Sequence, residues 1–135
     1  MKKYLLTLVL ALITTMSFAQ KNEFQLSSHI LDISKGMPAS EVTIQLNQYN
    51  EKDKTWSLID EKVTDKNGRV PDFLPSKNSN IGIYKLTFLT EDYFKKCKTD
   101  SFYPFIEVVF EIKDENHYHV PITLSAYGYS TYRGN

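Results

Sequence analysis

Short stretches of alternating apolar and polar residues follow one another along most of the chain. In the clearest of them, EVTIQLNQY at 41–49, Val42, Ile44 and Leu46 alternate with polar side chains. An alternation of period two is typical of a strand with one buried face. Comparable stretches lie at 26–33, 55–64, 81–90, 105–113 and 117–132. Because clusters of turn residues separate them, the pattern predicts an all-β domain, an antiparallel β-sandwich of seven or eight strands.

The alternation also predicts which side chains face the core. In the strands at 55–64 and 81–90, the residues expected to point inward are Trp56, Leu58, Val63, Ile81, Ile83, Leu86 and Phe88. Pro121 interrupts the last stretch, and because proline cannot donate to a strand ladder, it predicts an edge position or a bulge. An Asn-Gly pair at 67–68 predicts a tight turn between two strands.

One stretch favours a helix, TEDYFKKC at 90–97. Thr90 can cap its first turn, where two acidic residues follow, and two lysines lie in its last turn. Acidic side chains near the start of a helix and basic ones near its end are stabilised by the helix dipole. We therefore expect one short helix within the sandwich.

The first nineteen residues have the composition of a secretory signal peptide. Lys2 and Lys3 precede an apolar run from 4 to 13, and the small residues Ser17 and Ala19 follow. This predicts a signal peptide at 1–19, cleaved after Ala19, and one domain at 20–135. A retained membrane anchor is the disfavoured alternative, because the apolar run is too short to span a bilayer. We expect a periplasmic or secreted protein that is not bound to a membrane after cleavage.

Charge and cysteine content narrow the range of functions. Loss of the two signal lysines would turn the balance of 16 basic and 16 acidic residues into a net charge of −2, and no basic stripe indicates a nucleic-acid partner. The single Cys97 cannot form an internal disulfide, so an exported domain must rely on its core or on assembly with copies of itself. We interpret Cys97 as a half-buried thiol rather than a reactive nucleophile. Cys97 and the three histidines form no known zinc spacing, so no metal site is predicted.

Four polar residues are candidates for chemistry. His29 lies within a predicted strand, where a sandwich would ordinarily have Val, Ile or Thr. His117 and His119 are two residues apart, so in an extended strand they share a face. Arg69 directly follows the turn glycine. Each residue alone is more often a surface or hydrogen-bonded side chain than a catalytic one, and only their combination is informative.

The order and surroundings of these residues resemble a known family, the 5-hydroxyisourate hydrolases or transthyretin-related enzymes. SHILDISKGMPAS resembles the family's first strand, with its histidine and the Gly and Pro that follow. TDKNGR resembles its arginine-bearing turn, and HYHVPITLSAYGYSTYRGN resembles its long C-terminal strand ending in Tyr-Arg-Gly-Ser. The resemblance covers the chain from Leu26 to Asn135, and the last segment is the most specific.

The resemblance implies a transthyretin-like sandwich, a homotetramer with pockets between dimers, and a substrate derived from purines. The implied reaction is hydrolysis of 5-hydroxyisourate to 2-oxo-4-hydroxy-4-carboxy-5-ureidoimidazoline in urate catabolism, with no cofactor. The implied catalytic residues are His29, Arg69 and His119, and the implied substrate-binding residues are His29, Arg69, Tyr132, Arg133, Gly134 and Asn135. His117 is taken as a neighbour. The chain departs from the family pattern at Asn135, where the family has Ser, and at Ala126, where it has Pro.

These residue types suit the implied chemistry. Opening a cyclic amide requires a water made nucleophilic, a stabilised oxyanion and a proton for the leaving nitrogen. Histidine titrates near neutral pH and can move the protons. Arginine stays charged and presents a planar fork to carbonyl oxygens. A final strand with Tyr127, Tyr129 and Thr131 on one face can pack in the sandwich or against another subunit and hold the chain end in the site.

Two other classes of protein share the predicted fold. A transthyretin-like carrier of a small apolar molecule would have the same sandwich and central channel, and is expected to lack the two histidines, the arginine and the terminal Tyr-Arg-Gly. A structural or adhesive sandwich would need none of these residues. Their presence favours the hydrolase.

Overall fold

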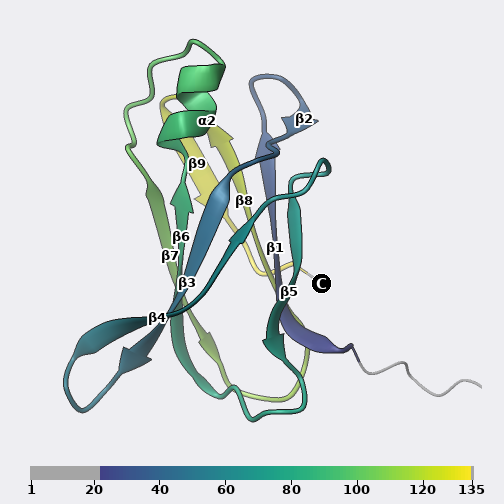
Figure 1. Ribbon diagram of the computed structural model, residues 1–135, viewed down its shortest axis with the longest axis vertical. Helices are drawn as coiled ribbons and strands as arrows, with labels where there is room; N and C mark the ends of the chain where they lie inside the picture. Colours follow the sequence, from purple (N-terminus) through teal and green to yellow (C-terminus); the bar gives the residue numbers. More distant parts are fainter. Residues whose placement is uncertain (1–21, 135) are drawn as a thin grey trace, which may run out of the picture.

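Two β-sheets packed face to face form the body of the protein (Figure 1). The computed structural model describes residues 22–134, so the predicted signal peptide and Asn135 lie outside the described residues. One sheet has the order β2-β1-β8-β9, with β5 also paired to β1. Its strands are β1 (Phe24–Asp32), β2 (Met37–Pro38), β5 (Arg69–Pro75), β8 (Tyr118–Ser125) and β9 (Gly128–Thr131).

The second sheet has the order β4-β3-β6-β7. Its strands are β3 (Thr43–Asn50), β4 (Thr55–Val63), β6 (Gly82–Leu89) and β7 (Ile106–Ile112), and the short helix α2 (Glu91–Lys96) follows β6. The predicted all-β sandwich with one short helix is confirmed. Nine strands are present within residues 22–134, because the two-residue β2 is added and because the C-terminal stretch forms two strands, β8 and β9.

The core lies between the sheets and is built from the inward side chains that alternate along the strands. Val42, Ile44 and Leu46 are fully buried there, as predicted, and so are Leu86 and Phe88 of β6. Burying a side chain of this size stabilises a fold by about 1.5–3 kcal/mol relative to leaving it exposed. The other core residues with at most 1% of their surface exposed are Leu26, Ile30, Ala39, Val70, Phe73, Ile112, Ile122 and Leu124.

The inward positions predicted for β4 and for Ile81, which directly precedes β6, are wrong. Leu58 and Val63 are more than half exposed, and Ile81 is 58% exposed. Leu58 pairs with Asn47 and Val63 with Thr43 across the β3–β4 ladder, so both lie on the face of the sheet opposite to that of the buried residues of β3. Trp56 is half-buried by a different contact, since its ring centroid lies 4.9 Å from that of Tyr49 on the neighbouring strand.

Pro121 lies on neither an edge strand nor a bulge of its own strand. β8 is flanked by β1 on one side and by β9 on the other, and its pairing with β1 is parallel, unlike every other named strand pair in the described part of the chain. The β8–β9 ladder stops at Ile122 and Thr131. The Thr131 hydroxyl then donates to the Pro121 carbonyl at 2.9 Å. Proline is tolerated here because the pairing on that side is interrupted at Pro121, between the Ile122–Thr131 pair and the His119–Gly134 bridge, so no N–H is needed from this residue.

The predicted helix is present, although its cap differs from expectation. Thr90 occupies the N-cap position but its side chain makes no capping hydrogen bond, and its buried hydroxyl has no partner among the described residues. The helix is held instead by Tyr93, whose hydroxyl donates to the buried carboxylate of Asp32 at the end of β1 (2.7 Å). Cys97 ends the helix as a half-buried free thiol, as expected.

Of the two contacts predicted for the tyrosines of the C-terminal stretch, packing within the sandwich is not found, and contact with another subunit stays a prediction. Tyr127 lies in the turn between β8 and β9 and is 75% exposed. Tyr129 packs edge-on against Tyr103, with ring centroids 5.1 Å apart. Within residues 22–134, no helix is long and apolar enough to cross a membrane.

A tight turn at 65–68 joins β4 to β5. The Asp65 carboxylate accepts the backbone N–H of Asn67 (2.8 Å) and of Arg69 (3.0 Å). Gly68 has a positive φ of 69°, and a Cβ at this position would lie 2.6 Å from the Ile30 carbonyl oxygen. The predicted turn is thus confirmed, and its glycine is required both by conformation and by contact with β1.

The role of Gly68 can be separated from the ordinary cost of a positive φ. Gly36 has a similar φ of 63°, but a Cβ added there would meet no atom within 4 Å, so Gly36→Ala should lower the free energy of unfolding by about 1–2 kcal/mol. Gly68→Ala should lose a further 1–3 kcal/mol, roughly, because the methyl group overlaps β1. Urea unfolding of both variants measures the difference, and equal losses would contradict the contact with β1.

Candidate active site

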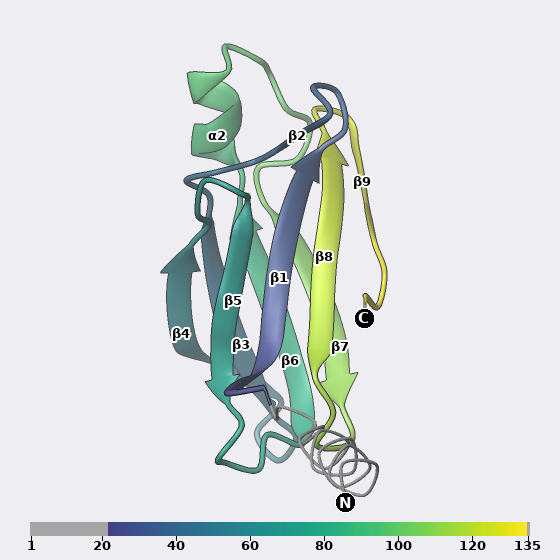
Figure 2. The same ribbon diagram turned by 90° about the vertical axis from the view of Figure 1, so that its right-hand side faces the viewer.

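Strands β5, β1 and β8 lie side by side in one sheet (Figure 2). The outer face of this sheet carries the candidate residues. Along β1, Leu26, Ser28 and Ile30 are buried, whereas Ser27 and His29 are half-buried. Successive side chains of a strand point to opposite faces, so Ser27 and His29 share the outer face. The predicted site residue His29 is therefore presented outward from a strand whose other face anchors the core.

Arg69 reaches the same face from β5. It is the first residue of β5 and pairs with His29 in the antiparallel β1–β5 register. The turn fixes this register, because the Gly68 carbonyl accepts the backbone N–H of Ile30 at 2.9 Å. Arg69 is exposed, and it is the positively charged residue that pairs directly with His29 across the β1–β5 ladder.

His119 reaches the face from the other side of β1. In the parallel β1–β8 register it lies opposite Ser27, and Pro121 lies opposite His29. Its Nδ1 is 2.8 Å from the Ser27 hydroxyl oxygen. The same hydroxyl is 2.9 Å from Nε2 of His117. Three neighbouring strands thus bring His29, Arg69 and His119 together, although 92 residues separate Ser27 from His119.

Both predicted catalytic histidines are held in their neutral form near pH 7. Partial burial lowers the pKa of His29 below its ordinary 6.5, and the Arg69 charge lowers it further, against the Asn67 backbone and the Asp65 charge. Burial also lowers the pKa of His119, followed by the charges of Arg69, His29 and His117, with the Ser27 backbone acting in the opposite direction. A neutral imidazole can accept a proton, so the site is prepared for general-base chemistry.

The C-terminal segment after β9 packs against His119 through Gly134. The Gly134 N–H donates to the His119 carbonyl at 2.8 Å, and the two residues form an isolated antiparallel bridge. A Cβ on Gly134 would lie 2.5 Å from Cδ2 of the imidazole. The ring therefore rests against the bare backbone of Gly134, and only glycine leaves room for it.

The rest of the predicted terminal tetrapeptide is placed differently. The Arg133 guanidinium carbon lies 4.6 Å from the ring centroid of Tyr118, whose side chain is buried in the core-facing layer. In a single chain the structure thus directs this side chain away from the two histidines. Tyr132 is 59% exposed, and Asn135 lies outside the described residues. A binding role for these three residues stays a prediction.

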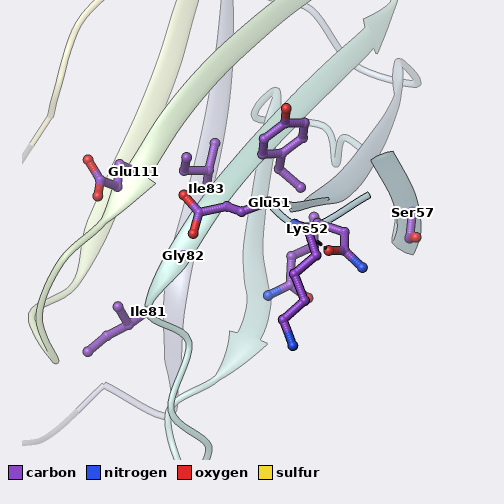
Figure 3. Close-up of a pocket in the computed structure, with 10 residues that line it drawn as sticks. Glu51, Lys52, Ser57, Ile81, Gly82, Ile83 and Glu111 are labelled. Atoms are coloured by element: carbon purple, nitrogen blue, oxygen red, sulfur yellow. Dashed lines mark hydrogen bonds between the residues drawn. The ribbon is translucent and has the colours of Figure 1, made fainter. Parts of the chain in front are cut away.

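A pocket of about 270 Å³ lies beside the cluster and is lined in part by Ser27, Arg69 and His117. A larger pocket of about 640 Å³ lies on the second sheet, between the β3–β4 hairpin and the start of β6 (Figure 3). Its charged side chains are Glu51, Lys52 and Glu111. It contains no histidine and no arginine, so it does not offer the acid–base pair found on the first sheet. No group of three metal-ligating side chains occurs in the described part of the chain.

The HIUase/Transthyretin family model matches residues 26–134, which includes both sheets and every described site residue. The chain belongs to this family. A probable 5-hydroxyisourate hydrolase of Caenorhabditis elegans is 47% identical over 111 residues, covering 82% of this chain and 81% of the relative. The resemblance inferred from the sequence motifs is confirmed.

Solved structures of both branches of the HIUase/Transthyretin family share this fold. Klebsiella pneumoniae 5-hydroxyisourate hydrolase is 33% identical, with a TM-score of 0.68 over 82% of this chain and 92% of the other. Sea bream transthyretin, solved in complex with thyroxine, is 30% identical, with a TM-score of 0.76 over 82% and 94%. The fold alone does not separate enzyme from carrier, so the site residues must.

Sequence reasoning missed Ser27 and set His117 aside. Ser27 is hydrogen-bonded to His119, and His117 is hydrogen-bonded to Ser27. The period-two spacing of Ser27 and His29, and of His117 and His119, already placed each pair on one face. The spacing could have identified them, but only the parallel β1–β8 register shows that the two pairs meet.

The packing of Gly134 on the imidazole leads to a structural prediction. Gly134→Ala should displace the His119 ring and shift its NMR resonances, while the free energy of unfolding changes by less than about 0.5 kcal/mol, because the residue lies beyond the last strand. Gly128→Ala is the matched control, since its Cβ would meet only the Ser125 hydroxyl at 3.9 Å. Unchanged His119 resonances in Gly134→Ala would show that the terminal segment does not define the ring position.

Proposed function

We propose that this protein hydrolyses 5-hydroxyisourate, opening its cyclic amide in urate catabolism. The observation that carries the proposal is the meeting of His29, Arg69 and His119 on one face, with both histidines neutral near pH 7. The 5-hydroxyisourate hydrolases among its relatives support the choice of substrate. The product is 2-oxo-4-hydroxy-4-carboxy-5-ureidoimidazoline.

The residues divide the reaction between them. A neutral imidazole, that of His119, takes a proton from water as the oxygen attacks the acyl carbon. The Arg69 guanidinium lies against the carbonyl oxygen and stabilises the negative charge that develops there, an effect worth about 3–4 kcal/mol for an aimed donor. The C–N bond then breaks, and the nitrogen receives the proton returned by an imidazolium, with His29 on the neighbouring strand β1 available to share this transfer. One water is consumed, and no electrons are exchanged.

Binding without hydrolysis is the alternative function, because sea bream transthyretin has the same fold and binds thyroxine in its solved structure. A carrier for an apolar ligand has no need of two neutral histidines beside a guanidinium. The polar character of the cluster therefore favours the hydrolase over the carrier.

Assembly and export belong to the same proposal. We propose a homotetramer, in which a second copy covers the open outer face that bears His29 and His119 and supplies part of the pocket. Tyr132 and Arg133, exposed in a single chain, would then contribute to a wall shared between subunits. The predicted signal peptide at 1–19 would direct the chain to the periplasm or out of the cell.

Enzymatic activity tests the function directly. Freshly prepared 5-hydroxyisourate should lose its absorbance much faster with the protein than in buffer. His119→Asn and His29→Asn should each reduce kcat by about 10²- to 10⁴-fold, and Arg69→Gln should impair it as well. Because the neutral histidines are the active form and their pKa values lie below 6.5, kcat/KM should be constant above pH 7 and fall only under more acidic conditions.

Lys66→Gln is the control for Arg69→Gln, since it removes an exposed positive charge from the same turn without touching the cluster, and it should retain full activity. Absence of any acceleration by the intact protein would favour the carrier. Thyroxine binding, measured by calorimetry, would then be the next assay.

Assembly is tested separately from activity. Analytical ultracentrifugation of the mature chain at micromolar concentration should give a species of four times the monomer mass. Tyr132→Asp should reduce the fraction of tetramer, because it places a charge in the proposed contact. A stable monomer with full activity would overturn the proposed shared pocket while leaving the reaction in place.

A further inference from the structure

The Ser27 hydroxyl lies between two imidazoles. Its oxygen is 2.8 Å from Nδ1 of His119 and 2.9 Å from Nε2 of His117, and Nδ1 of His117 is 3.1 Å from the backbone carbonyl oxygen of Phe24. All three side chains are half-buried on the outer face of β1 and β8. They form a chain of three hydrogen bonds that begins at a backbone carbonyl and ends at the proposed base.

The direction of every hydrogen bond follows from the first. A backbone carbonyl can only accept, so Nδ1 of His117 carries a proton and donates it to Phe24. In neutral His117, Nε2 is then an acceptor, and the Ser27 hydroxyl donates to it. The Ser27 oxygen is left to accept from His119, so Nδ1 of His119 carries the proton. Nε2 of His119 is therefore the unprotonated nitrogen, with its lone pair free.

We propose that Ser27 and His117 are positioning residues that hold neutral His119 in the Nδ1–H tautomer, with Nε2 available as the base. The effect on catalysis rests on the proposed function, whereas the tautomer itself does not. In the serine proteases, an orienting group that is changed so that histidine takes the wrong tautomer costs about 10⁴-fold in kcat. Here a hydroxyl and a second imidazole take the place of the carboxylate.

The groups that face His119 are compatible with this arrangement. Arg69, His29 and His117 are the charged or titratable side chains that act on it, and all three disfavour its protonation. Gly134 covers the ring near Cδ2, which is the carbon next to Nε2. In the described part of the chain, Nδ1 of His119 has the Ser27 hydroxyl as its hydrogen-bond partner at 2.8 Å, whereas Nε2 makes no hydrogen bond that would hold the proton there.

The tautomer is measured by ¹⁵N NMR of the histidine side chains at pH 8, well above the lowered pKa of His119. In the intact protein, Nδ1 of His119 should give a pyrrole-type resonance and Nε2 a pyridine-type resonance. Ser27→Ala removes the acceptor and should shift the population toward Nε2–H. His117→Phe should do the same, because the Ser27 hydroxyl becomes free to donate to Nδ1. A dominant Nε2–H form in the intact protein would overturn the proposal.

Kinetics of the same variants test the consequence. Ser27→Ala should lower kcat by about 10- to 1000-fold with little change in KM, and Ser27→Thr should restore kcat to within about threefold, because the hydroxyl is retained. Ser28→Ala is the matched control: its hydroxyl lies on the opposite face of β1 and donates to the Val120 carbonyl at 2.8 Å, so neither kcat nor the tautomer should change.

The two proposals can fail independently. If the intact protein has the Nδ1–H tautomer but does not hydrolyse 5-hydroxyisourate, the hydrogen-bond chain is supported and the proposed function is wrong. If the protein is active and Ser27→Ala retains both kcat and the tautomer of His119, the function stands and the positioning role is overturned.

Discussion

The parallel pairing of β1 with β8 is the constraint on which the rest of the site depends. It places Ser27 opposite His119 and His29 opposite Pro121. A slip of one residue would turn one strand's histidine toward the core, because side chains alternate between the faces. The register is protected by burial of Leu26, Ile30 and Ile122 on the inner face. The apolar core therefore sets the geometry of the polar face behind it.

The turn before β5 depends on the same strand. Gly68 lies against the Ile30 carbonyl, and its own carbonyl accepts the Ile30 N–H. Arg69 follows directly and is thereby fixed beside His29. Burial lowers the pKa of both imidazoles, and the positive charge of Arg69 lowers it further.

Much of this architecture could be predicted from the sequence, and the failures have physical causes. Alternation correctly identified the strands and the buried residues Ile44 and Leu46, because their strand is central. The prediction failed for Leu58 and Val63. An alternation of apolar and polar residues shows that a strand has two different faces, but it does not show which face another layer covers. Motif resemblance identified His29, Arg69 and His119, whereas the contact between Ser27 and His119 depends on a pairing across 92 residues that local patterns do not encode.

Because of this separation along the chain, β1 and its partner β8 are synthesised at different times. β1 leaves the ribosome well before its partner β8 is made, and at about 5–20 residues per second the interval is roughly 5–20 s. Until then, the edge of β1 that later binds β8 has no backbone partner, and such edges invite pairing with other chains. A nascent chain kept unfolded by a holding factor would avoid this hazard, which is compatible with the proposed export of the chain in an extended form.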